Sequence, residues 1–212
     1  MSVPPDRRSR KRLATRQSIS DAATLLFIER GFDRVTVDEI AAAADVGRMT
    51  VFNYFPRKED MIFDRDEEGR EMLRDALRQR GPGVAPIEAY RLLAHRLIAE
   101  QSPAAEFSAR SQGFIATVEK SETLKARARA IRDELADVVT EALAEGAGRK
   151  ATDPDARLAA ALLLATWTVA FTEAHRTFRQ TGDTGMAKAA FLALIDKGSA
   201  GLKVAMAGTP YA

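Results

Sequence analysis

Residues 36–55 read TVDEIAAAADVGRMTVFNYF, a stretch that predicts two short helices joined by a tight turn. Thr36 can cap the first helix, and Glu39, three residues later, completes a capping box. The apolar side chains of that helix recur at the spacing of one helical face. Asp45 falls at the turn, where a short polar residue tolerates a left-handed backbone. Two helices and a turn of this size predict a helix-turn-helix.

The second helix of the motif is expected from about Arg48 to Tyr54, with Gly47 as its N-cap. Its interior side is expected to hold Val51, Phe52 and Phe55, and its outer side Arg48, Met49, Thr50, Asn53 and Tyr54. A helix of this length fits a major groove. A plain antiparallel helix pair inside an all-α domain is the alternative, because periodicity alone does not separate the two.

Basic residues stand on both sides of the motif. Six precede it with no acid among them: Arg7, Arg8, Arg10, Lys11, Arg12 and Arg16. Arg57 and Lys58 follow it directly. Such a run is often a solvated, disordered tail, but ahead of a helix-turn-helix it is expected to lie along phosphates or in a minor groove. The context therefore favours DNA binding over plain packing.

Residues 18–61 resemble the DNA-binding domain of the tetracycline-repressor (TetR) family. The shared positions are Gly31-Phe32, Thr36, Ile40-Ala41, Ala44, Val46, Thr50, Tyr54-Phe55, Lys58-Glu59 and Met61. Three positions differ: Asp45 replaces the usual turn Gly, Gly47 the usual capping Ser, and Phe52 the usual Tyr. The last two changes remove hydroxyl groups, and none of the three breaks the motif.

Side-chain chemistry then gives each outward residue an expected role on double-stranded operator DNA. Arg48 is expected to read a base, because Arg bonds guanine bidentately. Met49 and Phe52 would supply apolar contact, for example to thymine methyl groups. Phosphate contacts that fix the register are expected from Thr36, Thr50, Asn53, Tyr54 and Lys58, and from the basic residues Arg10, Lys11 and Arg12.

The composition of the chain excludes several classes of protein. The 212 residues can form a sizeable core, the net charge is only +2, and there is no Cys, so disulfide and thiolate chemistry are excluded. No apolar run reaches the length of a membrane span, and the basic N-terminus is not followed by an apolar signal core. These features predict a cytoplasmic protein without a membrane partner.

The rest of the chain predicts an all-α protein of two domains, a three-helix DNA-binding domain over 10–56 and a helical domain over 57–208. Residues 1 to about 9 are expected to be disordered, and the first helix is expected from about Lys11 to Arg30. A further helix is expected to begin near Arg57, and another to cover Ala104 to about Thr117. No spacing of His or carboxylate groups predicts a metal site, a cofactor or a catalytic group, and the charge run 64–68 is expected to be a solvated helix face.

An aromatic stripe in the second domain predicts either core packing, a subunit interface or a small-molecule site. Its residues are Trp167, Phe171 and His175, with Phe107, Arg110 and Phe114 expected to face the same interior. The TetR resemblance implies that this domain binds an inducer or corepressor, of unknown identity here. It also implies a homodimer formed through the two last long helices, Asp155–Arg179 and Thr184–Met206.

The sequence therefore predicts a ligand-responsive transcriptional regulator, most often a repressor in that family, that binds a pseudo-palindromic operator. Two alternatives remain at this point. One is a DNA-binding protein without an effector, and the other is a helical enzyme or carrier in which the motif is scaffold.

Overall fold

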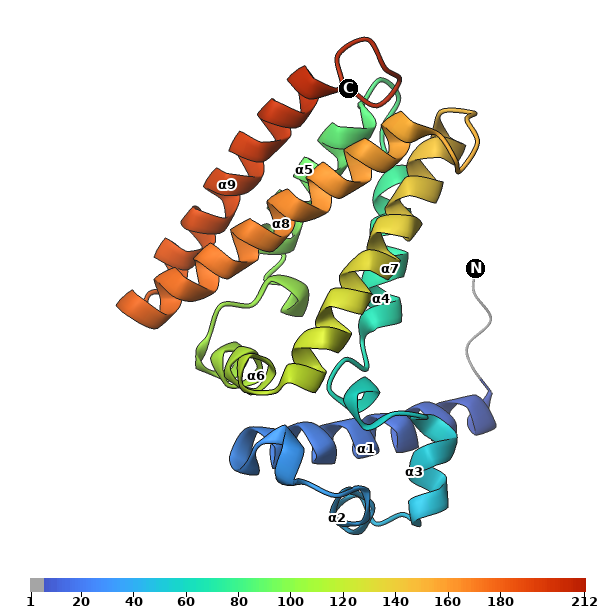
Figure 1. Cartoon of the computed structure of the whole chain (residues 1–212), viewed down its shortest axis with the longest axis vertical. Coiled ribbons are helices and arrows are strands. Elements are labelled where there is room, and N and C mark those ends of the chain that lie inside the picture. Colours follow the sequence, from blue (N-terminus) through green and yellow to red (C-terminus); the bar gives the residue numbers. More distant parts are fainter. Residues whose placement is uncertain (1–5) are drawn as a thin grey trace. The chain divides into compact units, whose positions relative to one another are not determined.

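Figure 1 shows the computed structural model of the chain, which describes residues 6–212. Within that range the long regular elements are all α-helices, so the predicted all-α class is confirmed. They are α1 (Arg7–Arg30), α2 (Val37–Ala43), α3 (Arg48–Tyr54), α4 (Asp66–Arg78), α5 (Pro86–Ala99), α6 (Ala109–Lys120), α7 (Glu122–Gly146), α8 (Pro154–Thr181) and α9 (Thr184–Ala205).

The described chain divides into two compact units. Unit 1 comprises the described residues up to Arg65 together with Gly113–Arg127, and unit 2 comprises Asp66–Gln112 and Ala128–Ala212. The corner between α6 and α7 belongs to unit 1 because its apolar side chains, among them Phe114 and Leu124, pack into the core of that unit.

Helix α1 begins at Arg7, one turn before the expected start near Lys11. The Asp6 carboxylate caps it by accepting a hydrogen bond of 2.7 Å from the backbone N–H of Ser9. Disorder was expected for residues 1 to about 9. That expectation is wrong for residues 7–9, and residues 1–5 lie outside the described range. The basic run is largely a helical extension.

The helix expected from Arg57 is interrupted. A 3-10 turn covers Lys58–Met61, and α4 begins only at Asp66. Two backbone carbonyls in this stretch accept hydrogen bonds from α1 instead of from the next helical turn. The Met61 oxygen accepts from Ser20 Oγ at 2.9 Å, and the Asp64 oxygen from Arg16 Nη1 at 3.0 Å. Tertiary contacts to α1 thus end the helix that local propensity predicts.

A second interruption replaces the helix expected over 104–117. A 3-10 turn at Pro103–Ala105 is followed by α6, which starts at Ala109. Ser108 precedes α6 and exchanges hydrogen bonds with Ser111: Ser111 N donates to Ser108 Oγ at 3.3 Å, and Ser108 N to Ser111 Oγ at 2.9 Å. This reciprocal cap fixes the new start.

Unit 2 is built on α8 and α9, which lie side by side (Figure 1). Helix α8 begins within one residue of the expected Asp155, because Asp153 Oδ1 accepts from Asp155 N at 3.0 Å and Pro154 occupies the first helical position. Gly198 of α9 faces Thr166 of α8 so closely that a Cβ at Gly198 would lie 2.2 Å from Thr166 Cγ2. A glycine is therefore required at this crossing.

Helix α8 is long and apolar enough to cross a membrane by length and composition, which corrects the expectation that no run has that capacity. In this structure, 44% of its most apolar window is buried inside the protein. Small and large apolar residues of α8 fill the core of unit 2: Ala156, Ala159, Ala160, Leu163, Leu164, Trp167, Ala170 and Ala174. The buried side of α8 thus belongs to the core, and the rest of its apolar window is at least partly exposed in the single chain.

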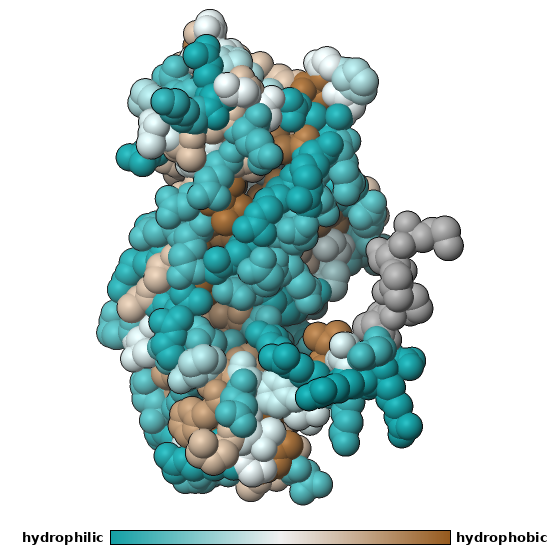
Figure 2. Space-filling model, turned by 90° about the vertical axis from the view of Figure 1, so that its right-hand side faces the viewer, coloured by the Kyte–Doolittle hydropathy of each residue, from teal (hydrophilic) through white to brown (hydrophobic). Residues whose placement is uncertain are grey.

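Only residues 66–68 of the charge run 64–68 lie in α4, where Glu67 and Glu68 are exposed as expected for a solvated helix face. Asp64 precedes α4 and its side chain is only 12% exposed, so the expectation is wrong for that residue. Arg70 bonds Asp66 at 3.1 Å, and it also pairs with Glu134 of α7. Figure 2 shows hydrophilic groups spread over the face that carries α4 and α7. The Arg70 side chain is only 19% exposed, so these two pairs are partly buried.

The Gly198 contact generates a stability prediction. Gly198→Ala is expected to lower the free energy of unfolding by about 1–3 kcal/mol, because α8 and α9 must separate to admit the methyl group. Gly69→Ala in α4 is the matched control, because nothing lies within 4 Å of its Cβ position. It is expected to stabilise by about 0.5–1 kcal/mol. Thermal unfolding measures both, and equal effects would contradict the close approach.

Candidate nucleic-acid interface

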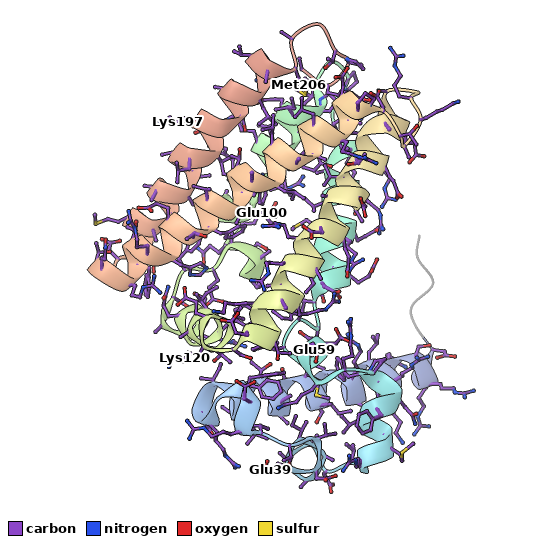
Figure 3. The ribbon with its side chains drawn as sticks, in the orientation of Figure 1. Glu39, Glu59, Glu100, Lys120, Lys197 and Met206 are labelled. Carbon is purple, nitrogen blue, oxygen red and sulfur yellow. The ribbon has the colours of Figure 1, made fainter. Side chains whose placement is uncertain are left out.

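Helices α2 and α3 have the predicted bounds of a helix-turn-helix, and the predicted capping box is confirmed. Thr36 Oγ1 accepts from Glu39 N at 3.3 Å, while Glu39 Oε2 accepts from Thr36 N at 2.8 Å. These bonds hold the pKa of the Glu39 carboxyl below its usual value, with a smaller contribution from Arg30, 2.8 Å away. Figure 3 labels Glu39 on this helix. The start of α2 is thereby fixed.

The turn between the two helices depends on Asp45. Its φ is 52°, the left-handed conformation expected from the sequence. Val46 then donates its backbone N–H to the Ala41 carbonyl oxygen at 3.0 Å, closing the end of α2. Gly47 follows with an extended backbone as the N-cap of α3. Beneath the turn, Val51 is completely buried.

The outward face of α3 is the centre of the candidate interface. Met49 is 71% exposed, a large value for an apolar side chain in a folded domain, and Arg48 and Asn53 are also exposed. Thr50 and Tyr54 are half-buried. This side of α3 therefore offers one cation, one apolar group and one amide to a partner.

Phe52 occupies an intermediate position. It was expected to face the interior and also to contact DNA, and the structure leaves it half-buried. Its ring lies beside the Arg48 guanidinium, with Cζ 5.6 Å from the ring centroid. Arg48 also forms an ion pair of 2.8 Å with Asp38 of α2. Two neighbours thus hold the expected base-reading group.

Thr36 and Lys58, both expected at phosphates, have partners within unit 1. The Thr36 hydroxyl donates to Glu39 Oε2 at 2.8 Å. The Lys58 ammonium donates to the Phe32 carbonyl oxygen and lies 4.2 Å from the centroid of the Phe32 ring. Burial lowers the pKa of Lys58, and the nearby carboxylate of Asp33 opposes that shift. Both residues therefore have contacts within unit 1, and phosphate contact stays a prediction for them.

The basic residues Arg10, Lys11 and Arg12 lie on the first turns of α1, and all three are exposed. A helical segment holds their charges in a defined direction, which a disordered tail would not do. Arg16, one turn further, instead packs over the Phe55 ring at 4.5 Å. Arg16 therefore stabilises unit 1.

In unit 2, four of the six residues expected to meet at a small-molecule site come together. Phe107 lies 5.1 Å from His175 and 6.1 Å from Phe171, and Trp167 lies 6.0 Å from Phe171, between ring centroids. Gln112 Nε2 donates to the His175 backbone oxygen at 3.1 Å and lies 3.1 Å from Nδ1. This aromatic cluster combines apolar rings with a buried imidazole.

The other two expected residues lie elsewhere. Arg110 is exposed, and Phe114 belongs to unit 1, where its ring packs against Phe63 at 5.9 Å. Sequence reasoning missed Phe191 of α9, which is fully buried and 4.8 Å from Phe171. Its place four residues before Ile195 in an apolar helix is a signal for a core position, but no signal in the sequence indicates this neighbour.

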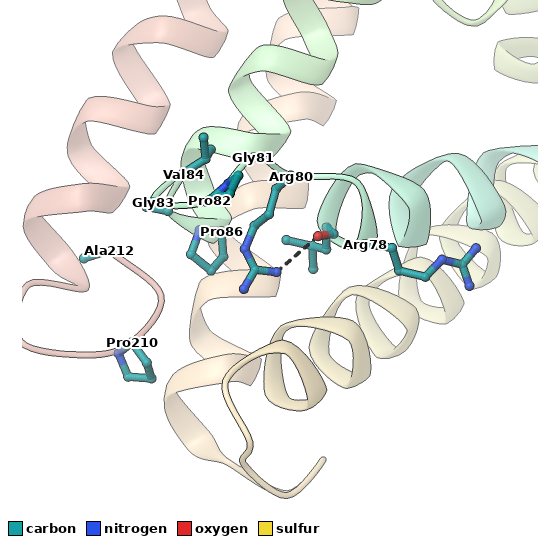
Figure 4. A pocket seen from close by; sticks show the side chains of 11 residues that line it. Arg78, Arg80, Gly81, Pro82, Gly83, Val84, Pro86, Pro210 and Ala212 are labelled. Carbon is teal, nitrogen blue, oxygen red and sulfur yellow. Dashed lines mark hydrogen bonds between the residues drawn. The ribbon is translucent and has the colours of Figure 1, made fainter.

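A surface crevice in unit 2 lies away from the aromatic cluster. It follows the turn between α4 and α5, and Figure 4 shows the side chains that line it. Arg80 Nη1 donates to the Leu77 backbone oxygen at 3.1 Å, and Nη2 to the Gly146 oxygen at 3.3 Å. These bonds hold the end of α4, and we assign the crevice no ligand.

Comparison with known proteins bears on the helix-turn-helix. The family model described as "Bacterial regulatory proteins, tetR family" matches residues 19–64. The repressor LfrR of Mycolicibacterium smegmatis is 32% identical over 85 residues, which are 40% of this chain and 44% of LfrR. The matched segments span from a quarter to less than half of the curated relatives' length.

Solved structures resemble the chain over most of its length. FadR of Thermus thermophilus, solved with lauroyl-CoA, is 26% identical with a TM-score of 0.52, covering 88% of this chain and 92% of FadR. SmeT of Stenotrophomonas maltophilia, solved with triclosan, is 20% identical with a TM-score of 0.57, covering 89% and 91%. At 20% identity, the likeness to SmeT shows the fold alone.

The all-α fold and the helix-turn-helix of this chain are thus similar to those of DNA-binding transcriptional regulators. Residues 19–64 match the TetR family of bacterial regulatory proteins, and the rest of the chain resembles solved members of that family in fold.

Proposed function

We propose that this protein is a transcriptional regulator of the TetR family, a cytoplasmic repressor that binds a pseudo-palindromic operator as a homodimer and responds to a small molecule. The outward face of α3 carries the proposal, because Arg48 and the 71% exposed Met49 stand on a helix that buried Val51 and Phe55 hold against the core. LfrR, a relative in the matched segment, is named a transcriptional repressor.

The DNA-binding part of the proposal separates base reading from phosphate contact. Arg48→Ala is expected to cost about 1–3 kcal/mol at one operator position in each half-site and to relax the preference there. Replacing Arg10, Lys11 and Arg12 by Gln is expected to weaken binding to all sequences and to lower the salt slope by about 0.9 for each phosphate that is no longer neutralised. Binding to a randomised pool of double-stranded DNA at several salt concentrations measures both.

The two variants control for each other, because both remove positive charge from exposed positions of unit 1. A uniform loss of affinity in the Arg48 variant would contradict its role as base reader. Unchanged salt dependence in the triple variant would make the start of α1 an ordinary solvated helix end.

The dimer is proposed through α8 and α9, where apolar side chains of unit 2 remain exposed in the single chain. Val169 is 56% exposed and Leu158 48% on α8, and Val204 is 78% and Met186 52% on α9. Exposed small residues lie between them at helical spacing: Ala161, Ala165, Ala189, Ala193, Ala200 and Gly201. Two copies of this surface would form a four-helix bundle about a two-fold axis.

The dimer surface predicts the effect of a charge placed at its centre. Val169→Glu is expected to shift the protein from dimer to folded monomer, because the interface would bury an unpaired carboxylate. Leu92→Glu on α5 is the matched control, since Leu92 is a 44% exposed leucine of the same unit outside α8 and α9. Light scattering measures the mass of each. A monomeric wild-type protein, or equal dissociation in both variants, would contradict the interface.

The effector is proposed to bind at the aromatic cluster of Phe107, Trp167, Phe171, His175 and Phe191. Phe107 and Phe191 are fully buried, so an apolar ligand would enter by moving these rings. Binding there would favour one conformation of the dimer, and DNA another, which couples the two events. The lauroyl-CoA of FadR, which carries an apolar acyl chain, and the apolar triclosan of SmeT are suitable probes.

Trp167 is the chain's one tryptophan and reports directly on this cluster. Titration with lauroyl-CoA or triclosan is expected to change its fluorescence and to lower DNA affinity about 5- to 150-fold, the usual range of allosteric coupling. Phe171→Ala is expected to reduce the fluorescence response. If neither probe changes the emission, and denaturation of the purified protein releases no small molecule for mass spectrometry, regulation without an effector becomes the better account.

A further inference from the structure

Asp38 and Arg48 form an ion pair that joins the first turn of α2 to the first turn of α3. Asp38 Oδ2 lies 2.8 Å from Arg48 Nη1, and the two side chains remain 63% and 59% exposed. An ion pair with this much exposure contributes little to folding stability. Its place on the outward face of the helix-turn-helix suggests a role in DNA reading instead.

Asp38 is held in place by its own helix. It is the second residue of α2, where the partial positive charge of the helix N-terminus favours a carboxylate. The capping box between Thr36 and Glu39 fixes that helix start around it. Asp38 can therefore act as a rigid acceptor for the longer and more flexible Arg48 side chain.

The Arg48 guanidinium is contacted from two directions. Asp38 accepts from Nη1, and the Phe52 ring, one turn further along α3, lies 5.6 Å from Cζ. A guanidinium has five N–H donors, so a bond to Asp38 leaves enough of them to reach both guanine acceptors, O6 and N7. Fixing the plane of the guanidinium before binding reduces the entropy lost when those two bonds form.

We infer that Asp38 is a specificity-determining residue that positions Arg48 to read guanine in each operator half-site. The inference rests on the proposed function, since it concerns the base that Arg48 contacts. The carboxylate also adds a negative charge near the phosphates, which by itself weakens binding to every sequence. Asp38 thus lowers the affinity for all DNA sequences and increases the preference for guanine at the position that Arg48 reads.

The test compares variants on a randomised pool of double-stranded DNA. Arg48→Ala is expected to lose guanine preference about 5- to 150-fold at its position. Asp38→Asn keeps the shape of the side chain and removes its charge, and it is expected to reduce the preference at that same position about threefold to tenfold. In the Arg48→Ala background, Asp38→Asn is expected to cause no further loss at that position.

Asp45→Asn is the matched control. Asp45 is exposed in the turn between the same helices, and Asn tolerates its left-handed backbone. The variant removes one negative charge from the helix-turn-helix and keeps the Asp38–Arg48 pair. It is expected to raise affinity for all sequences slightly, with an unchanged base preference. Thermal unfolding confirms that each variant is folded.

Three outcomes are distinguishable. A selective loss of guanine preference in Asp38→Asn alone supports the inference. Equal gains in affinity for Asp38→Asn and Asp45→Asn, with unchanged base preference, overturn it and make Asp38 a simple counter-charge. If the wild-type protein shows no base preference at all, the proposed function fails rather than the role of Asp38.

Discussion

The core beneath the helix-turn-helix is the constraint on which the DNA-facing surface depends. Ile40 of α2, Val51 of α3 and Phe55 at the end of α3 are essentially fully buried with α1 in one apolar cluster. Because an α-helix turns through a fixed angle per residue, burying Val51 determines which way Arg48, its neighbour one turn earlier, can point. The outward residues are thus placed by residues that never meet DNA.

The helix-turn-helix could be predicted from the sequence because its signals are local. The cap at Thr36, the left-handed Asp45 and the extended Gly47 each act within a few residues, and the structure has all three. The two interruptions of expected helices, at Lys58–Met61 and before Ala109, could not be predicted from local signals. The first depends on carbonyl oxygens that bond to α1 more than 40 residues away, at separations of 41 and 48. Local propensity contains no such information.

The candidate sites, like the fold, were predictable only where local signals determine them. Outward positions on α3 follow from periodicity, whereas the partners of those side chains do not. Nothing in the sequence near Lys58 indicates the Phe32 carbonyl, and nothing near Arg48 indicates Asp38 ten residues earlier. The aromatic cluster shows the same limit, since Phe191 joins it through the packing of α9 on α8. The type of each residue predicted which contacts its side chain could make, and the fold determined which neighbouring residue it contacts.

The composition of α8 illustrates how one helix can meet two demands. Its inner side, with Ala156, Ala160 and Trp167, fills the core of unit 2, while Leu158 and Val169 remain exposed. A helix covered on one side only would carry a polar opposite face. The proposed two-fold bundle would cover these exposed apolar residues with a second partner surface. In that bundle α8 would be buried from both sides, which would explain why its apolar window extends beyond the 44% that the single chain buries.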